Sequence, residues 1–281
     1  MNLARRPINL WQDKTLVAFD TETTGLWAPA NRIVEIGAVR FRLEAGELDR
    51  FSTLVNPQRP MPADVIRVHG ITDEMVAKAP TIDTALEAFR GFCRDDILVA
   101  HNAMFDISFV ACELKRLGQA FPDNPILDTV DLYQRFRPDL GSYALLSLVK
   151  QMSLGTGQDH RALADAQYVR RLTQLLAPEL GAAYSPADLG RIATVYSMSD
   201  WQQDDVVLPS GFEPLRTAIA NKTRVNMRYQ TPPHPPSWRV ITPLGLYGLA
   251  DKIYLNAFCE RSDSERTFRL DRISSFEVID Q

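Results

Sequence analysis

The chain has 281 residues, of which 45% are hydrophobic and 23% charged, and its formal net charge at pH 7 is -4. These values are ordinary for a globular protein and exclude a disordered or fibrous chain. The negative balance argues against an all-over electrostatic grip on nucleic acid, although one domain can still carry a basic patch. At this length the sequence predicts two domains.

The cysteines and the apolar runs exclude further classes. The three cysteines are far apart, without the paired spacing of a zinc site or the density of a disulfide scaffold, so buried thiols are expected. The first residues lack the apolar core of a secretion signal, and no window contains the roughly 20 apolar residues that a membrane span needs. We therefore expect a cytoplasmic protein with no membrane partner.

Strands and helices alternate over the first part of the chain. A short apolar strand is predicted over Leu16–Phe19, and two more strands joined by a turn at Ala45 and Gly46 form an antiparallel hairpin. Another strand is predicted at 97–101. Helical patterns cover six segments: 62–70, 81–96, 105–118, 128–136, 142–152 and 161–176. This alternation indicates an α/β domain over residues 13–178.

The pattern changes beyond Pro178. Residues 179–211 contain prolines, glycines and an acidic cluster, which suit a connector. Residues 212–281 open with one short helix and continue as strand-like runs with close turns. Several short strands of this kind predict a small β-barrel.

Two carboxylates follow the first predicted strand, in the stretch LVAFDTETTGL. Residues i and i+2 of a strand face the same side, so Asp20 and Glu22 project together from its carboxyl end. Neighbouring carboxylates raise each other's pKa unless a cation neutralises them, and such oxygen ligands suit Mg²⁺ or Mn²⁺. The spacing alone fits equally well a solvated strand end in which both acids face water.

Two more acids and a histidine extend this pair. Asp106 stands where a predicted strand has ended and a helix begins, a position that suits a helix cap or a metal ligand. Asp165 follows His160 by five positions, so the histidine precedes or opens a helix and the acid lies about one turn further on. Together with the first pair they predict a hydrolytic site with two metal ions, in which the histidine takes a proton from the attacking water.

Three stretches occur in order along the chain: FDTETTGL, HNAMFDISFV and HRALADA. Their order and spacing resemble the motifs of the DEDDh (DnaQ-like) family of 3′-to-5′ exonucleases, and the resemblance covers residues 13–178. It implies an RNase H-like fold, which is a mixed five-stranded sheet flanked by helices.

The resemblance also implies roles for the five site residues. Asp20, Glu22 and Asp165 would hold the metal that carries the attacking water. Asp106 would support a second metal, to which Asp20 bridges, and His160 would be the general base.

Family members hold the 3′-terminal nucleotide with residues near the first two motifs. Carried onto this sequence, the candidates are Thr23, Thr24, Gly25, Leu26, His69, Asn102 and Phe105. His69 lies in VHGIT, which resembles a segment that contacts terminal bases in polymerase-associated members, and it can equally be a helix-end histidine. Phe105 can stack on a base or fill the core.

In the second domain, the runs RVITPLGLY, IYLNAFCE and RTFRLDRI resemble a WYL domain, a small Sm-like barrel, over residues 212–281. The tryptophan that gives these domains their name is replaced by Ile253, ahead of Tyr254 and Leu255. WYL domains are associated with binding nucleic acid or nucleotide-like ligands through basic residues. The candidates here are Tyr229, Arg239, Arg261, Arg266, Arg269 and Arg272. Alternatively, the arginines are solvated charges paired with Asp263, Glu265 and Asp271.

Together the motifs predict a metal-dependent 3′-to-5′ exonuclease with two Mg²⁺ or Mn²⁺ ions. It would shorten single-stranded DNA or RNA with a free 3′ end, DNA favoured, and release 5′-monophosphates, while the barrel grips or senses the strand. Two alternatives stay open: an RNA exonuclease of the ribonuclease T or oligoribonuclease type, and a nucleic-acid-sensing regulatory module with weak nuclease activity. A homodimer and polymerase, repair or CRISPR-adaptation partners also stay open.

Overall fold

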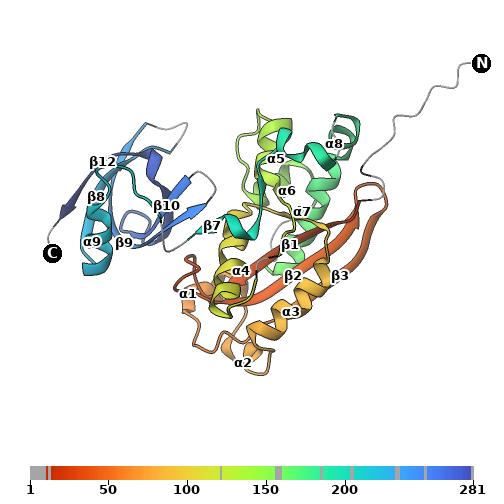
Figure 1. Cartoon of the computed structure of the whole chain (residues 1–281), viewed down its shortest axis with the longest axis horizontal. Helices are drawn as coiled ribbons and strands as arrows, with labels where there is room; N and C mark the ends of the chain where they lie inside the picture. The colour runs from red at the N-terminus through yellow and green to blue at the C-terminus, as the bar shows by residue number, and fades with distance from the viewer. Residues whose placement is uncertain are drawn as a thin grey trace, which may run out of the picture. The chain divides into compact units, whose positions relative to one another are not determined.

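The computed structural model describes residues 11, 14–120, 122–155, 160–183, 186–202, 206–231, 235–249 and 252–279. The chain divides into two compact units, with the boundary between Met198 and Ser199. The first unit contains the predicted exonuclease residues, and the second contains the predicted WYL residues (Figure 1). Each unit has its own buried apolar core.

Within the described residues, six strands form a mixed β-sheet in the first unit. They are β1 (Leu16–Thr23), β2 (Ile33–Arg42), β3 (Gly46–Leu54), β4 (Ile97–Ala100), β5 (Ile126–Asp128) and β6 (Val195–Tyr196). Their order in the sheet is β3-β2-β1-β4-β5-β6. Strand β1 is antiparallel to β2 and parallel to β4, and β4 is parallel to β5. The predicted hairpin corresponds to β2 and β3, with Gly46 at a positive φ of 85° in its turn.

Helices flank this sheet. They are α1 (Ala63–His69), α2 (Asp73–Val76), α3 (Ile82–Cys93), α4 (Met104–Arg116), α5 (Thr129–Phe136), α6 (Leu145–Gln151), α7 (Ala162–Leu175) and α8 (Ala177–Ala183). Helix α7 packs against β1 and β2, and α3 packs against β2 and β3 (Figure 1). The buried cluster that contains Ala18 of β1 also contains residues of α5, α6, α7 and α8.

The two faces of β1 determine where its polar residues point. Ala18 lies in the core beneath α7, whereas Phe19 faces α3, with its ring 5.6 Å from that of Phe89. Because side chains alternate along a strand, Asp20 continues the α7 face and Thr21 continues the α3 face. The apolar core thus gives way to polar residues on both faces of the strand at its carboxyl end.

The sheet has one strand more than the five that the resemblance predicted. Strand β6 pairs antiparallel with β5 and comes from the segment that was expected to be a connector. That segment also contains the 3₁₀ helix η1 (Pro186–Arg191), and it supplies Leu180, Leu189 and Ile192 to the core of the first unit. A two-residue strand has no hydrophobic periodicity, so the sequence carried no signal for it.

The second unit is built around an antiparallel sheet. Its strands are β7 (Trp201–Gln202), β8 (Arg224–Tyr229), β9 (Ser237–Leu249), β10 (Lys252–Cys259), β11 (Ser264–Arg269) and β12 (Ile273–Ile279). The order is β11-β10-β9-β8-β12, with β7 also paired to β9, and helix α9 (Pro214–Asn221) packs against β9 and β12. The described pairings do not join β11 to β12, so the Sm-like barrel stays a prediction.

The cysteines and the character of the helices bear on two further expectations. The three cysteines are free and buried, which confirms the prediction of buried thiols. Over the described ranges, no helix combines the length and the apolar character that crossing a bilayer requires.

Candidate active site

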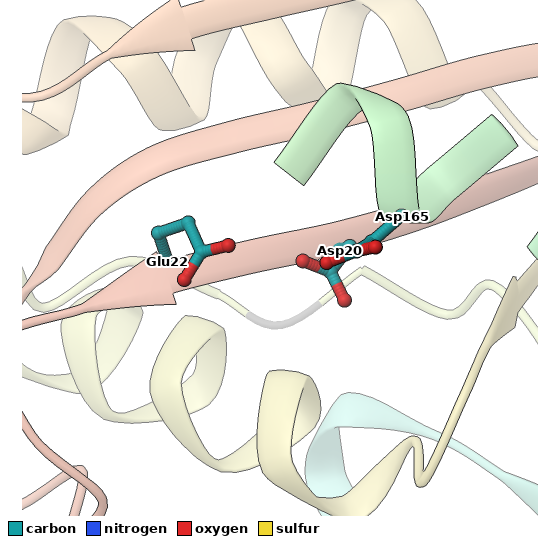
Figure 2. Close-up of side chains that lie close together, drawn as sticks. All are labelled: Asp20, Glu22 and Asp165. Atoms are coloured by element: carbon teal, nitrogen blue, oxygen red, sulfur yellow. The ribbon is translucent and has the colours of Figure 1, made fainter. Parts of the chain in front are cut away.

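Three carboxylates converge at the carboxyl end of β1. Asp20 and Glu22 lie two positions apart on the strand, and Asp165 lies in the first turn of α7. One oxygen of each carboxylate lies within 4.8 Å of the others, and Figure 2 shows the strand and the helix that carry them. The fold therefore brings together the three acids that the resemblance assigned to one metal.

Asp106 approaches the same strand from its other face. It is 1% exposed in the first turn of α4, and its Oδ1 accepts hydrogen bonds from the backbone N–H (2.9 Å) and the hydroxyl (2.8 Å) of Thr21. These two bonds tie the start of α4 to β1. They place a fourth carboxylate next to Asp20, whose pKa its charge helps to raise.

Burial and the crowding of these acids raise their pKa values. Burial first, and then the charges of Asp165 and Glu35, raise the pKa of Glu22 to about 8. Burial also raises the pKa of Asp106 to about 7, although the hydrogen bonds that it accepts oppose the increase. The pKa of Asp20 lies well above its ordinary value because of burial and then of its acidic neighbours. Without a counter-charge the site therefore holds protons that isolated carboxyl groups would release.

This donor set fits a divalent metal ion. Mg²⁺ and Mn²⁺ prefer oxygen ligands, and a cation among the acids removes the repulsion that contributes to their raised pKa values. Asp20, Glu22 and Asp165 are the residues that would hold it, and Asp106 lies beside Asp20. Three carboxylates suit Mg²⁺ and Mn²⁺ alike, so the donors do not select between them.

His160 stands two residues before the first residue of α7. Its side chain is partly exposed and its backbone has a positive φ of 27°, which few non-glycine residues adopt. The amide of Asp165 donates a hydrogen bond to the carbonyl of Arg161 (3.0 Å), which starts the helix. The predicted order, with the histidine before the helix and the acid in its first turn, is confirmed.

The turn after β1 is held by its own hydrogen bonds. The hydroxyl of Thr23 donates to the carbonyl of Gly25 (2.7 Å), and the hydroxyl of Thr24 donates to the side chain of Asn31 (3.2 Å). A Cβ added at Gly25 would lie 2.5 Å from that side chain, so any larger residue must displace it. Leu26 follows with 46% of its surface exposed. The four predicted nucleotide-binding residues thus form one ordered turn beside Glu22, with an apolar side chain facing solvent.

Helix α4 anchors this turn from outside, a contact that the sequence did not indicate. Arg116 donates to the carbonyls of Ala28 (2.8 Å) and Pro29 (2.7 Å), and it also bonds to Glu113 (2.9 Å). Glu113 is fully buried and accepts a second charged hydrogen bond from Arg32 (2.7 Å). Two arginines and one glutamate therefore join the middle of the loop, and its end at Arg32, to α4.

The other predicted substrate-binding residues differ in accessibility. His69 is 5% exposed, its Nδ1 accepts a hydrogen bond from the N–H of Ile71 (3.0 Å), and burial lowers its pKa. Asn102 is exposed, with a positive φ of 57°. Phe105 is partly buried, with its ring 4.9 Å from that of Phe109. The ring of His69 therefore stabilises the chain just after the C-terminal end of α1 in this structure. Asn102, in contrast, is accessible to a ligand.

Asp128 is a buried acid in this region that the sequence reasoning missed. At the end of β5, its carboxylate accepts hydrogen bonds from the N–H groups of Asn102 (2.9 Å), Ala103 (3.0 Å) and Val130 (2.8 Å). It thus caps α5 and also holds the segment that leads into α4 and Asp106. An acid between an apolar strand and a helix is an N-cap signal, so the sequence could have predicted that Asp128 caps α5. It could not have predicted the contacts with Asn102 and Ala103.

In the second unit, Tyr229 is the centre of one group of the predicted ligand-binding residues. Its hydroxyl accepts a hydrogen bond from the N–H of Arg269 (3.2 Å), and the guanidinium of Arg239 lies 5.9 Å from the centre of its ring. The side chain of Arg269 also bonds to Asp271 (3.0 Å), so one of the alternative ion pairs forms.

The other arginines among the predicted ligand-binding residues bond to hydroxyl groups or lie in a 3₁₀ helix. Arg261 donates to the hydroxyl of Ser237 (3.2 Å), and Arg266 donates to that of Ser262 (3.3 Å). Arg272 lies in the 3₁₀ helix η3 (Leu270–Arg272), between β11 and β12. Because a hydroxyl carries no charge, these bonds do not neutralise the positive charges of Arg261 and Arg266.

Two family models match this chain. The RNase_T model, described as an exonuclease, matches residues 17–173, which is more than half of the chain. The protein belongs to this exonuclease family. A second model, described as a WYL domain, matches residues 211–278. The exonuclease domain is therefore followed by a WYL domain.

The exonuclease domain is similar to part of the PolC-type bacterial DNA polymerases. The chain is 39% identical over 160 residues to DNA polymerase III PolC-type of Bacillus subtilis, and 40% identical over 156 residues to that of Clostridium perfringens. These matches cover 56% and 55% of this chain, respectively. They cover only 11% of the length of each polymerase. The chain thus spans about a tenth of the length of these relatives.

Solved structures share the fold of the exonuclease domain. Exonuclease X in complex with 5′ overhanging duplex DNA has a TM-score of 0.52 and 27% identity, over 63% of this chain and 98% of that one. The nuclease domain of 3′hExo, a DEDDh family member bound to rAMP, has a TM-score of 0.54 and 15% identity, over 60% and 94%. The exonuclease domain therefore has the RNase H-like DEDDh fold that the sequence predicted.

Proposed function

We propose that this exonuclease removes nucleotides from the 3′ end of single-stranded DNA and releases 5′-monophosphates. The convergence of Asp20, Glu22 and Asp165 at the end of β1 carries the proposal. Asp106 on the other face of that strand and His160 ahead of α7 complete the set of residue types that the chemistry needs.

The turn after β1 binds the terminal nucleotide. Its backbone is fixed by the hydrogen bonds of Thr23 and Thr24 and by the tight packing at Gly25. The exposed side chain of Leu26 offers an apolar surface to the last base. Because this turn follows Glu22 directly, a nucleotide held there has its phosphate close to the carboxylates.

The carboxylates and the histidine divide the work of hydrolysis. Asp20, Glu22 and Asp165 would hold one divalent cation, and Asp106 would support a second one together with Asp20. When bound, the cations neutralise the charge that develops on the phosphate and make water a better nucleophile. His160, which precedes α7, accepts the proton that the attacking water loses.

The named relatives favour DNA over RNA as the substrate class. The PolC-type relatives are DNA polymerases, and the Exonuclease X structure at 27% identity is a complex with DNA. The neighbours named for RNA are 15% and 16% identical, so they support the fold and not the substrate.

The test is degradation of matched DNA and RNA oligonucleotides, single- and double-stranded, labelled separately at each end, with Mg²⁺ or Mn²⁺. We expect single-stranded DNA labelled at its 5′ end to shorten as a ladder, and a 3′ label to leave first as a mononucleotide. Early release of the 5′ label, or cleavage within the strand, would contradict the proposed polarity. Faster degradation of RNA would favour the ribonuclease alternative.

The loop anchor predicts an effect on substrate affinity. Arg116→Ala removes the donor to the carbonyls of Ala28 and Pro29, which loosens the turn that binds the terminal nucleotide. A charged hydrogen bond contributes about 1.5–3 kcal/mol, so we expect KM to rise roughly tenfold with a smaller change in kcat. Steady-state kinetics measure this, with Arg191→Ala, at an exposed position at the end of helix η1, as the matched control. Equal KM values for Arg116→Ala and the control would show that the anchor is dispensable.

We assign nucleic-acid binding in the WYL domain to the arginines near Tyr229, including Arg272, whose carbonyl accepts a hydrogen bond from the N–H of Gln230 (3.0 Å). Arg239 and Arg272 are replaced with alanine in the full chain. We expect the slope of log affinity against log salt concentration to become shallower by about 1 for each arginine, because each lost phosphate contact releases fewer counterions from the nucleic acid. Binding of labelled single strands is measured in EDTA, which prevents hydrolysis. Arg228→Ala is the control, since this exposed residue lies on the opposite face of β8 from Tyr229. Equal slopes in the double variant and the control would remove the arginines' assigned role.

A further inference from the structure

Strand β2 carries a buried charge where its neighbours are apolar. Glu35 is 1% exposed between Val34 and Ile36, which are fully buried, and it lies directly opposite Glu22 in the pairing of β1 with β2. A buried carboxylate is costly unless it is paired and hydrogen-bonded, so its partners show what it does.

The side chain of Glu35 is hydrogen-bonded to the start of α7. Its Oε1 accepts from the guanidinium of Arg161 (2.6 Å), and its Oε2 accepts from the same guanidinium (3.0 Å) and from the N–H of Ala162 (3.0 Å). The planar fork of arginine fits a carboxylate in this bidentate way, and the amide of Ala162 belongs to the first turn, where helical N–H groups need an outside acceptor. Glu35 therefore fixes both the distance of the N-terminal end of α7 from β2 and the orientation of that end.

Gly37 allows this contact because it has no side chain to separate β2 from α7. It lies on the same face of β2, two residues after Glu35 and directly opposite Asp20. A Cβ added at Gly37 would lie 2.2 Å from backbone atoms of Ala162 and Leu163, closer than any real contact allows. The backbone of α7 thus rests on the strand itself, next to the first catalytic acid.

We infer that Glu35, Gly37 and Arg161 are positioning residues that set the catalytic geometry. His160 directly precedes Arg161, so the ion pair fixes the segment that carries the proposed general base. Asp165 lies in the same first turn, because its amide bonds to the carbonyl of Arg161. The contacts of Glu35 and Gly37 with the start of α7 thereby place Asp165 next to Asp20 of β1. This inference rests on the proposed function for its kinetic readout and on the carboxylates alone for its metal-binding readout.

Glu35→Gln in the full chain tests the ion pair. The glutamine keeps the size and one acceptor but loses the charge, and loss of a residue that orients metal ligands typically costs 10- to 100-fold in metal affinity or activity. We expect kcat on single-stranded DNA to fall by about that factor with KM within about twofold, and Mn²⁺ binding measured by calorimetry to weaken by about tenfold or more. Unchanged kcat and Mn²⁺ affinity, with only a lower melting temperature, would overturn the inference.

A double-variant cycle and a glycine pair complete the test. If the two side chains act as one unit, Glu35→Gln combined with Arg161→Gln loses no more activity than the worse single variant, whereas additive losses contradict the pairing. Gly37→Ala is expected to reduce Mn²⁺ affinity, while Gly91→Ala, whose Cβ would meet nothing within 4 Å, leaves it unchanged. If wild type degrades no substrate, the proposed function fails, and Mn²⁺ affinity in the same variants still decides the inference.

Discussion

Asp20→Asn is expected to slow metal-dependent degradation of single-stranded DNA by at least about 10²–10³-fold, the range seen when one preorganised stabilising group is removed from an active site. Asparagine keeps the size of the side chain but loses the charge. Asp20 has the central place in the cluster, since it lies within reach of Glu22 and Asp165 and is next to Asp106 on the other face. Its loss therefore weakens both proposed cation positions.

The effect on rate is measured in single turnover with a 5′-labelled strand at saturating protein and several Mg²⁺ concentrations. Asp95→Asn is the matched control, because this exposed acid precedes β4 at the end of the strand away from the site. We expect the control to retain the wild-type rate and high Mg²⁺ to recover little of the rate of Asp20→Asn. A rate for Asp20→Asn within twofold of the control would show that the acids on β1 do not hold the catalytic cation.

The sequence predicted those parts of the site that depend on local geometry. Asp20 and Glu22 were found because alternation along one strand puts them on one face, and Asp165 because helical spacing places it one turn after His160. The contact between Asp106 and Thr21 crosses from a helix to a strand 85 positions earlier. No local pattern encodes such a pairing, so the sequence predicted that Asp106 belongs to the site but not what holds it there.

The residues that were missed are those whose partners lie far along the chain. Glu35 stands in the apolar run IVEIGAV, where a single acid in a buried strand is a signal of a paired charge. Its partner Arg161 is 126 positions away, so the sequence alone could not identify the pair. Gly37 lies in the same run, where a glycine on its own only predicts a weaker strand. Its role follows from the close approach of the α7 backbone, which the sequence does not show.

Metal removal is expected to make stability depend on pH in a direction set by the acidic cluster. The pKa of Glu22 is about 8 in the folded protein, against 4.5 for an ordinary glutamate, so the folded state binds more protons than the unfolded state between these values. The stabilising contribution of the protonated carboxyl is complete below about pH 4.5 and is lost as pH rises through about 8. Asp106, whose pKa is raised to about 7, acts in the same direction.

The window from pH 7 to 9 isolates this effect. Burial lowers the pKa of His101 to about 4, so that residue stays neutral throughout the window and adds little slope. One group with a pKa near 8 loses about 1.4 kcal/mol of stabilisation over this range, which corresponds to a decrease of about 3 °C in melting temperature. We expect calorimetry of the full chain in EDTA to show a decrease of at least this size in the transition of the exonuclease domain.

A bound cation should reverse this slope, because it binds the deprotonated carboxylates. The stabilisation by Mn²⁺ is therefore expected to grow from pH 7 to pH 9 as protons cease to compete for the ligands. Asp20→Asn removes one charge from the cluster, so the same scan of this variant should be flatter in EDTA and respond less to Mn²⁺. A melting temperature that is independent of Mn²⁺ across the window would mean that the acids are paired within the protein, and the site would then have no place for a catalytic cation.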